Sequence, residues 1–349
     1  MLIFIINLKK SIDRKKSMEE KIKNLAKRTH YEIYLESHLL DSKAESLRDK
    51  AEVIYFDSKD SINGLPRHIN VARNDENAVP PLSRNDENTT LPRHINEARN
   101  DEKITPSLSH NDKNSVQLSR NDEKNTPLSR NSQRFYFHFF EAVDAKDIES
   151  KKIKINHYSA ILSKFVRGKE LSFGELACFA SHYALWEKCV ALGENIIILE
   201  DDMSFRDDFL DSIINIQDSR FEYVRLYYLF DRKIRHLSDR FYISYANLSG
   251  TQGYFLSPNA AKRFILHSKI WFHCIDNYMD MFFINKNPNI IYKPFCVYED
   301  DVYAKDSTIK GREKVKIKWQ YNLMREISRI VLFGVYRNLY IFFCKIKGI

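Results

Sequence analysis

The segment IIILEDDMSF (Ile196–Phe205) decides the fold, because four consecutive apolar residues run directly into three acidic ones. Such an uninterrupted apolar run is typical of a strand buried on both faces of a parallel sheet. Three carboxylates at its end lie at the carboxyl edge of the sheet, where ligands bind in α/β proteins. Their mutual repulsion favours a bound cation, and hard divalent ions prefer oxygen ligands. The alternative is that Asp201 or Asp202 caps a helix over Phe205–Ile214.

Strands and helices alternate around this segment. The helix at Leu171–Gly193 is the clearest, because Ser172 and Glu175 form an S-x-x-E capping box ahead of an apolar stripe. The other expected elements are strands at Leu2–Leu8, Val53–Phe56, Phe135–Ala142 and Gly250–Leu256, helices at Ser11–Arg28 and from Ser257-Pro258 to His267, and a further segment at Ile275–Ile284. This order predicts an α/β fold with a largely parallel sheet.

The chain divides into four parts: residues 1–56 and 135–310, which together form the α/β domain, an insertion at 57–134, and a tail at 311–349. The insertion repeats itself, since LPRHINVARNDEN (Leu65–Asn77) returns as LPRHINEARNDEK (Leu91–Lys103). Each repeat carries too few large apolar side chains to build a continuous core, so the insertion is predicted to be disordered. Its acidic residues offset its basic ones and it lacks aromatic residues, which argues against nucleic-acid binding.

The composition points to an anionic partner and a cytoplasmic location. A net charge of +8 suits nucleic acid, an acidic membrane surface or a phosphorylated ligand. Five scattered cysteines without a CxxC pair are typical of reduced thiols in the cytosol. The first residues place their apolar run before their lysines, the reverse of a secretory signal. No uninterrupted run reaches the roughly 18 apolar residues that a membrane span needs.

The tail at 311–349 mixes aromatic residues with Lys and Arg, and Arg337 interrupts its apolar stretch. This pattern favours a basic amphipathic helix lying on an anionic leaflet over a membrane span. The alternative is a helix packed on the core of the protein.

Five segments in this order resemble glycosyltransferase family 25, the lipooligosaccharide galactosyltransferase-like group that includes collagen galactosyltransferases. They are INLKKSIDRKKSME, FFEAVDAKD, LSFGELACFASHYALWEKC, IIILEDD and GTQGYFLSPNAAKRFI, and the likeness covers Leu2–Arg28 and Phe135–Asp301. The resemblance implies a GT-A-like, Rossmann-type fold and inverting transfer of a hexose. The implied donor is a UDP-sugar, usually UDP-galactose. The implied acceptor is a lipid-linked lipooligosaccharide or lipopolysaccharide at the inner face of the inner membrane.

The resemblance also implies a set of site residues. Glu200 and Asp202 are the expected ligands of Mn²⁺ or Mg²⁺, which would neutralise the leaving diphosphate. Asp276 is the expected catalytic base, with Glu299, Asp300 and Asp301 in reserve. The expected donor-binding residues are Arg14, Asp144, Glu175, His182, Asp201 and Gly253.

Each assignment has a structural alternative. Arg14 could be a solvated helix charge, Asp144 a loop cap, and Glu175 only a part of the capping box. His182 could be a satisfied helix histidine, and Asp276 could cap a helix at Asn277–Ile284. Gly253 could belong to a tight turn. The rival functions are a basic nucleic-acid-binding protein and a catalytically inactive scaffold related to the family.

Overall fold

The computed structural model describes residues 1–35, 133–300, 302 and 318–346. The insertion predicted at 57–134 lies outside these residues except for its last two, and the strand predicted at Val53–Phe56 lies outside them entirely.

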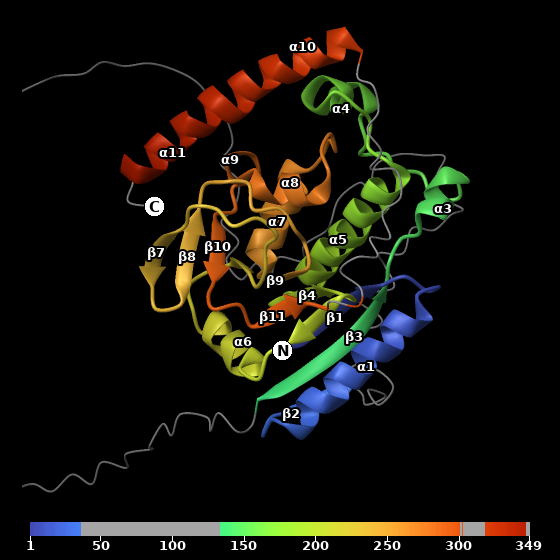
Figure 1. The fold of residues 1–349 in the computed structure, drawn as a ribbon, viewed down its shortest axis with the longest axis vertical. Coiled ribbons are helices and arrows are strands. Elements are labelled where there is room, and N and C mark those ends of the chain that lie inside the picture. Colours follow the sequence, from blue (N-terminus) through green and yellow to red (C-terminus); the bar gives the residue numbers. More distant parts are fainter. Residues whose placement is uncertain (36–132, 301, 303–317, 347–349) are drawn as a thin grey trace, which may run out of the picture. The chain divides into compact units, whose positions relative to one another are not determined.

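A nine-stranded sheet in the order β2-β3-β1-β4-β9-β6-β10-β8-β7 organises the described residues (Figure 1). Its strands are β1 (Leu2–Asn7), β2 (Glu32–Leu35), β3 (Arg134–Glu141), β4 (Ile196–Glu200), β6 (Tyr223–Arg225), β7 (Arg235–Ser238), β8 (Phe241–Ser244), β9 (Gly253–Leu256) and β10 (Asn289–Tyr292). Neighbours pair parallel from β2 through β3 and β1 to β4, and again between β6 and β10. The pairs β4–β9, β9–β6, β10–β8 and β8–β7 are antiparallel.

The α/β class is therefore confirmed, whereas the sheet is mixed. The parallel arrangement predicted from the apolar strands holds for the half that contains β1 and β4. In the other half, β7 and β8 form a hairpin with a two-residue connection, which only antiparallel strands permit.

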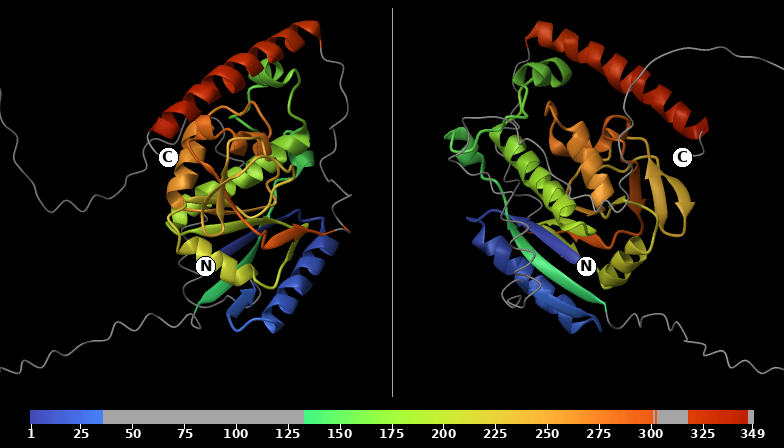
Figure 2. Two further views of the ribbon diagram at one scale, coloured as in Figure 1. Left: turned by 60° about the vertical axis from the view of Figure 1, so that its left-hand side comes forward. Right: turned by 180° about the vertical axis from the view of Figure 1, so that it is seen from behind.

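Each face of the sheet has its own core, because neighbouring residues on a strand point to opposite sides. Ile3 and Ile5 of β1 pack with the apolar residues of α1 (Ile12–Lys27) and α6 (Phe209–Gln217). Leu2 and Phe4 of the same strand pack with α5 (Phe173–Leu192), α7 (Pro258–His267) and α8 (Ile275–Asp280). Figures 1 and 2 show these two groups of helices on opposite sides of the sheet.

The helix ends follow the chemistry of their capping residues. The predicted capping box is confirmed: the Ser172 side chain accepts from the Glu175 amide, and the Glu175 side chain accepts from the Ser172 amide. Ser257 caps α7 with Pro258 in its first turn, again as predicted. The shorter helices are α3 (Ala145–Glu149), α4 (Ala160–Arg167) and α9 (Phe282–Asn285).

The acidic triplet does not cap a helix. Asp201 and Asp202 lead into β5 (Met203–Phe205), which pairs antiparallel with β11 (Val297–Glu299). Met203 and Phe205 are buried in the core beneath the main sheet, which holds this segment extended. The alternative of an acidic cap on a helix over Phe205–Ile214 is therefore wrong, and α6 begins four residues after Phe205, at Phe209.

A long helix follows the gap in the described residues. It comprises α10 (Trp319–Ser328), a π-helical segment η4 (Arg329–Tyr336) and α11 (Arg337–Ile346). Its 26 residues Trp319–Cys344 are, by length and composition, long and apolar enough to cross a membrane. Arg329 and Arg337 stand among its many large apolar residues, so the helix is apolar as a whole although it holds no uninterrupted apolar run of about 18 residues.

One side of this helix packs on the protein. Tyr321 contacts Phe165 of α4, and farther along Phe333 and Tyr340 contact Phe283 and Phe282 of α9. The tail is thus a helix that docks on the domain through one face.

Candidate active site

The carboxyl ends of β1 and β4 open into a large cavity. The two strands pair in parallel, with Ile6 opposite Glu200, so Asn7 and the acidic triplet emerge at the same edge of the sheet. The cavity has a volume of ≈ 1410 Å³. All the predicted site residues except Gly253 line it: Arg14, Asp144, Glu175, His182, Glu200, Asp201, Asp202 and Asp276.

Gly253 lies in β9, where it is buried. A Cβ atom at this position would come within 3.1 Å of a methyl group of Leu199 on the neighbouring strand. Close packing of β9 on β4 therefore accounts for glycine here. The residues just before it, Gly250, Thr251 and Gln252, do line the cavity.

Asp201 is held by the first strand and the first helix. Its Oδ2 accepts from the side-chain Nδ2 of Asn7 at 2.7 Å, and its Oδ1 lies 3.0 Å from Nη1 of Arg14. Burial raises the pKa of the Asp201 carboxyl, and the contacts with Arg14 and Asn7 oppose that rise. Arg14 is consequently the partner of a buried acid rather than a solvated helix charge.

Two side chains approach the carboxylate of Glu200. The Thr251 hydroxyl donates to its Oε1, and Nε2 of His182 lies 3.6 Å from the same oxygen. Burial acts to raise the pKa of Glu200, but His182 and Thr251 outweigh it and hold the pKa below its ordinary value. Glu200 is therefore a carboxylate at neutral pH, with the side chain 26% exposed toward the cavity.

Asp202 has the opposite character. Its Oδ1 is buried without a hydrogen-bond partner among the described residues. Burial, together with the charges of Glu200 and Asp201, raises the pKa of its carboxyl to about 7. A carboxyl with one buried oxygen that lacks a donor, placed among like charges, is costly to ionise, and a divalent cation would relieve that cost. The chemistry of Asp202 and Glu200 thus fits a hard metal ion.

The helix α5 contributes one face to the cavity. Glu175 fills its role in the capping box and also pairs with Arg167 at 2.6 Å, so both of its functions seen here are structural. One turn and two turns further on, Cys178 and His182 also line the cavity. His182 is 1% exposed, and its Nδ1 lies 2.9 Å from the Tyr254 hydroxyl.

Asp276 lies in the first turn of α8 and lines the cavity. Its Oδ1 accepts from the backbone amide of Asn277 at 2.8 Å, and its negative charge acts on Glu200. The helix begins at Ile275, so Asp276 is not its N-cap residue. The position gives it both a local structural contact and access to a ligand.

The second acidic cluster is divided between two places. Glu299 lines the cavity, where it accepts from Gln252 at 2.9 Å and from Tyr227 at 3.3 Å. Asp300 pairs with Lys21 of α1 at 2.7 Å and is not among the residues that line the cavity. Asp301 lies outside the described residues.

Basic residues also line the cavity. Lys10 bonds the carboxylate of Asp144 at 2.6 Å, and Asp144 caps α3 by accepting from the Lys146 amide. The Lys10 contact lowers the pKa of Asp144. Lys10, Lys146, Lys151 and Lys154 all line the cavity. Asp144 caps a helix, whereas its structural alternative was a loop cap, and its position also holds a lysine at the site.

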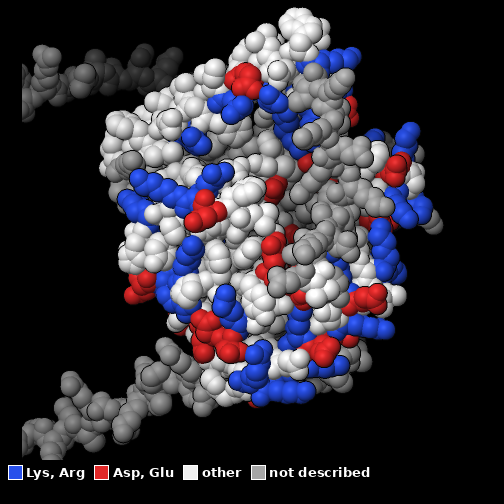
Figure 3. All heavy atoms as spheres, viewed as in Figure 1, with Lys and Arg blue, Asp and Glu red and all other residues white. Residues whose placement is uncertain are grey.

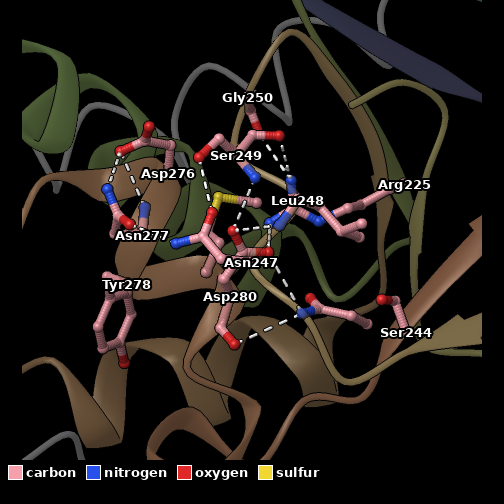
Figure 4. Close-up of polar contacts among 12 residues, drawn as sticks. Arg225, Ser244, Asn247, Leu248, Ser249, Gly250, Asp276, Asn277, Tyr278 and Asp280 are labelled. Atoms are coloured by element: carbon pink, nitrogen blue, oxygen red, sulfur yellow. Dashed lines mark hydrogen bonds and ion pairs between the residues drawn. The ribbon is translucent and has the colours of Figure 1, made fainter. Parts of the chain in front are cut away.

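A buried ion pair, which the sequence patterns did not reveal, supports the loop at 247–252 (Figure 4). Arg225 of β6 bonds Asp280 of α8 at 3.0 Å and the carbonyl of Gly250 at 2.6 Å. Asp280 in turn accepts from the amides of Leu248 and Ser249. This network holds the loop that presents Thr251 and Gln252 to the cavity.

Thr251 was also missed, because a lone threonine in a loop carries no sequence signal. Thr251 reaches the Glu200 side chain because its loop packs against the end of β4, where the backbone amide of Glu200 donates to the carbonyl of Gln252. Thr251 and Glu200 are 51 residues apart in the sequence, so only the fold shows that they are neighbours.

Comparison with known proteins finds similarity to one family. Residues 117–279 match the model of glycosyltransferase family 25, described as an LPS biosynthesis protein. A "Lipooligosaccharide biosynthesis protein lic2B" of Haemophilus influenzae is 29% identical over 195 residues, covering 50% of this chain and 70% of that protein. A "Glycosyltransferase 25 family member" of Aedes aegypti is 28% identical over 168 residues, covering 43% of this chain and 27% of its own length.

Some relatives are described as inactive. A "Probable inactive glycosyltransferase 25 family member 3" of Rattus norvegicus is 36% identical over 74 residues, or 20% of this chain and 13% of that protein. The matches to the mosquito and rat proteins thus span less than a third of those longer chains. The family match takes in the helix with the capping box, the acidic triplet and Asp276. Over residues 117–279 the chain is therefore similar to glycosyltransferase family 25.

Proposed function

We propose that this chain is an inverting hexosyltransferase that transfers a sugar, most simply galactose from UDP-galactose, to a lipooligosaccharide acceptor. The name of the Haemophilus relative supports the acceptor class. The observation that carries the proposal is the acidic triplet at the end of β4, which faces a cavity with lysines on its wall. A GT-A-like fold, in which the donor lies at the carboxyl ends of the strands, accords with this arrangement.

The cavity offers suitable groups for a nucleoside diphosphate. Its volume of ≈ 1410 Å³ exceeds the roughly 300–1,000 Å³ of pockets that hold one drug-sized ligand, so a donor and part of an acceptor would fit. Lys10 and Lys146 are positioned to attract phosphate oxygens. Arg14 is engaged with Asp201, so its first task is to keep that acid in place.

Glu200 and Asp202 would hold Mn²⁺ or Mg²⁺ here. When bound, such an ion neutralises charge on the leaving diphosphate. The orphaned Oδ1 of Asp202 and the ionised Glu200 support this assignment. Thr251 fixes the Glu200 side chain through its hydroxyl.

Asp276 is the proposed base. The acceptor hydroxyl oxygen forms a bond to C1 of the donor sugar while the bond from C1 to the diphosphate oxygen breaks. UDP leaves with the electron pair of that bond, and a carboxylate oxygen of Asp276 takes the hydroxyl proton. Attack opposite the leaving group inverts the configuration at C1.

A panel of UDP-sugars tested for turnover and thermal shift with Mn²⁺ examines this proposal. A bound donor should raise the melting temperature, because ligands that bind only the folded state stabilise it. We expect UDP-galactose to give metal-dependent release of UDP. Binding without any turnover on acceptors or water would favour the inactive-scaffold alternative, and binding of nucleic acid that ignores UDP would favour the other rival.

We further propose that the helix Trp319–Ile346 lies on the anionic inner leaflet, where lipid-linked acceptors reside. Its outward side bears a stripe of exposed apolar residues: Trp319, Leu323, Ile327, Ile330, Val331, Val335, Leu339, Phe342, Phe343 and Ile346. Figure 3 shows mainly uncharged atoms along this helix, interrupted by a small charged group. Residues 309–318, just before the helix, carry five Lys or Arg and one Glu, which suits an anionic surface.

Packing of the opposite side on α4 and α9 supports a helix that lies in the interface rather than one that spans the bilayer. The test is co-sedimentation with vesicles that contain anionic lipid, at low and high salt. Replacing Ile330, Val335 and Leu339 together by Gln should strongly reduce binding. A matched control, Leu266→Gln with Ile270→Gln, alters exposed apolar residues elsewhere and should bind as the unmodified chain does. Equal binding of all three proteins would rule out the helix as the anchor.

A further inference from the structure

Cys178, His182 and Glu200 form a compact cluster at the wall of the cavity. A sulfur, a nitrogen and an oxygen from these side chains all lie within 4.8 Å of one another. Cys178 and His182 are four residues apart on α5, which places them on one face of the helix, one turn apart. Glu200 reaches the same point from the end of β4. Two separate secondary-structure elements thus bring together three groups that bind metals.

The distances suit a common metal ion. Nε2 of His182 lies 3.6 Å from Oε1 of Glu200, which is too long for a hydrogen bond. Two ligands at about 2.0–2.1 Å from a tetrahedral zinc ion are about 3.4 Å apart, and a thiolate at about 2.3 Å increases that separation slightly. The separation of His182 and Glu200 is therefore close to that of two ligands on one tetrahedral ion, and the sulfur of Cys178 lies within 4.8 Å of both.

His182 points an orphaned nitrogen into the cluster. Its Nε2 is buried and makes no hydrogen bond within the part of the chain that the structure describes. The Nδ1 atom of the same ring lies 2.9 Å from the Tyr254 hydroxyl, which also accepts from Trp186 at 3.0 Å. With its proton on Nδ1, the ring donates to the Tyr254 oxygen and directs the Nε2 lone pair at the cluster. Histidines that bind metals are commonly oriented by such a bond from the other ring nitrogen.

We infer that Cys178, His182 and Glu200 form a binding site for a borderline-soft divalent metal, with Zn²⁺ as the preferred ion and a fourth position open to the cavity. A thiolate and an imidazole select Zn²⁺ over Mg²⁺ or Mn²⁺, which favour oxygen ligands. Three protein ligands with one position open to water or substrate differ from structural zinc sites, which use four protein ligands. The site stands on these three side chains and does not depend on the proposed transfer reaction.

This site shares Glu200 with the hard-ion pair, which is Glu200 and Asp202, the residues proposed to hold Mn²⁺ or Mg²⁺. Zn²⁺ bound to Cys178 and His182 would draw on the Glu200 carboxylate that Mn²⁺ or Mg²⁺ would also use. Zinc should therefore weaken the binding of Mn²⁺ to the chain by competition at one ligand. This competition can be measured in the absence of any sugar donor.

Cobalt titration of the full chain under thiol-free reducing conditions tests the inference. Co²⁺ replaces Zn²⁺ in such sites, and a thiolate ligand gives an absorption band in the near ultraviolet that oxygen ligands do not give. We expect one equivalent of Co²⁺ to produce this band together with the visible bands of tetrahedral cobalt, and one equivalent of Zn²⁺ to remove both. Calorimetry with Zn²⁺ alone should give the same stoichiometry.

Variants assign the ligands. Cys178→Ala should abolish the near-ultraviolet band and weaken Zn²⁺ binding at least tenfold, while Cys274→Ala, which removes another half-buried thiol, should change neither. Asp202→Asn should keep the cobalt spectrum and lose Mn²⁺ binding, which separates this site from the hard-ion pair. Thermal melting of each variant in the absence of metal verifies its fold.

Two results would overturn the inference. One is a folded wild-type chain that shows no thiolate–cobalt band at any Co²⁺ concentration up to saturation of calorimetric binding. The other is a band that survives Cys178→Ala, which would assign the thiolate to a different cysteine.

Discussion

Asp280→Asn removes one charge from the buried pair with Arg225 and keeps the size of the side chain. Asp280 accepts four hydrogen bonds: its Oδ1 accepts from Arg225 and Asn289, and its Oδ2 accepts from the amides of Leu248 and Ser249. Asparagine has one carbonyl oxygen, so its amide group would face two of these donors. Arg225 would remain charged while only 1% exposed.

These losses set the expected magnitude. Removing one partner from a buried ion pair costs about 3–5 kcal/mol, because the remaining charge has no compensation. For a domain of this size, each kcal/mol lowers the melting temperature by about 2–4 °C. We therefore expect a fall of about 6–20 °C, together with weaker binding of any ligand that contacts Thr251 or Gln252.

Urea and thermal unfolding measure the effect, with Glu222→Gln as the control. Glu222 pairs with Arg263, but both side chains are about one-third exposed, so its loss should cost no more than about 1 kcal/mol. The double variant Arg225→Met with Asp280→Asn should recover part of the loss, because it leaves no buried charge. If Asp280→Asn cost no more than Glu222→Gln, the network in Figure 4 would not hold the loop as argued.

Three further outcomes are expected. Asp202→Asn should reduce Mn²⁺-dependent hydrolysis of the UDP-sugar by about a hundredfold. The melting temperature of the metal-free variant should stay within a few degrees of that of the unmodified chain. Near-normal turnover of the variant would contradict the role of Asp202. The pKa of Asp202 is raised to about 7, so Mn²⁺ must displace a proton from this carboxyl at lower pH. Calorimetry should therefore show the affinity for Mn²⁺ rising about tenfold from pH 5.5 to 6.5 and levelling off above pH 8. An affinity that does not change with pH would exclude the release of a proton from Asp202. Burial raises the pKa of Glu187 to about 7 from 4.5, so the folded state holds its proton more tightly and stability from this group is lost as pH rises from about 4.5 to 7. Glu187→Gln should then stabilise the chain at pH 8 by about 1 kcal/mol in urea unfolding, after allowance for partial exposure, and by nothing at pH 4.

The sequence predicted those parts of the site that depend on local patterns. The apolar run before Glu200 fixed a buried strand, and the S-x-x-E pattern fixed where α5 begins. Once β1 and β4 pair in parallel, Asn7 and Asp201 must emerge together, so the location of the cavity follows from two local signals.

Contacts between distant segments were out of reach. Arg225 and Asp280 are 55 residues apart, and neither stands in a pattern that distinguishes it from a surface charge. The short strand at Met203–Phe205 escaped for a different reason: its partner, Val297–Glu299, is far away in the sequence, and an acidic residue before an apolar stretch also suits a helix cap. The antiparallel pairing of β9 with β4 and β6 likewise joins strands that lie far apart in the sequence.

The contacts of Asp201 determine the electric charge that an incoming ligand meets. Arg14 cancels the charge of Asp201. The carboxyl of Asp202, with its pKa of about 7, carries on average about half a negative charge at neutral pH. Glu200 and Asp202 together therefore present a charge of roughly −1.5, which repels a diphosphate. One divalent cation turns this into a slightly positive surface. The order of addition follows from electrostatics alone: the cation must arrive before the nucleotide or with it, and a nucleotide offered to the metal-free chain should bind weakly.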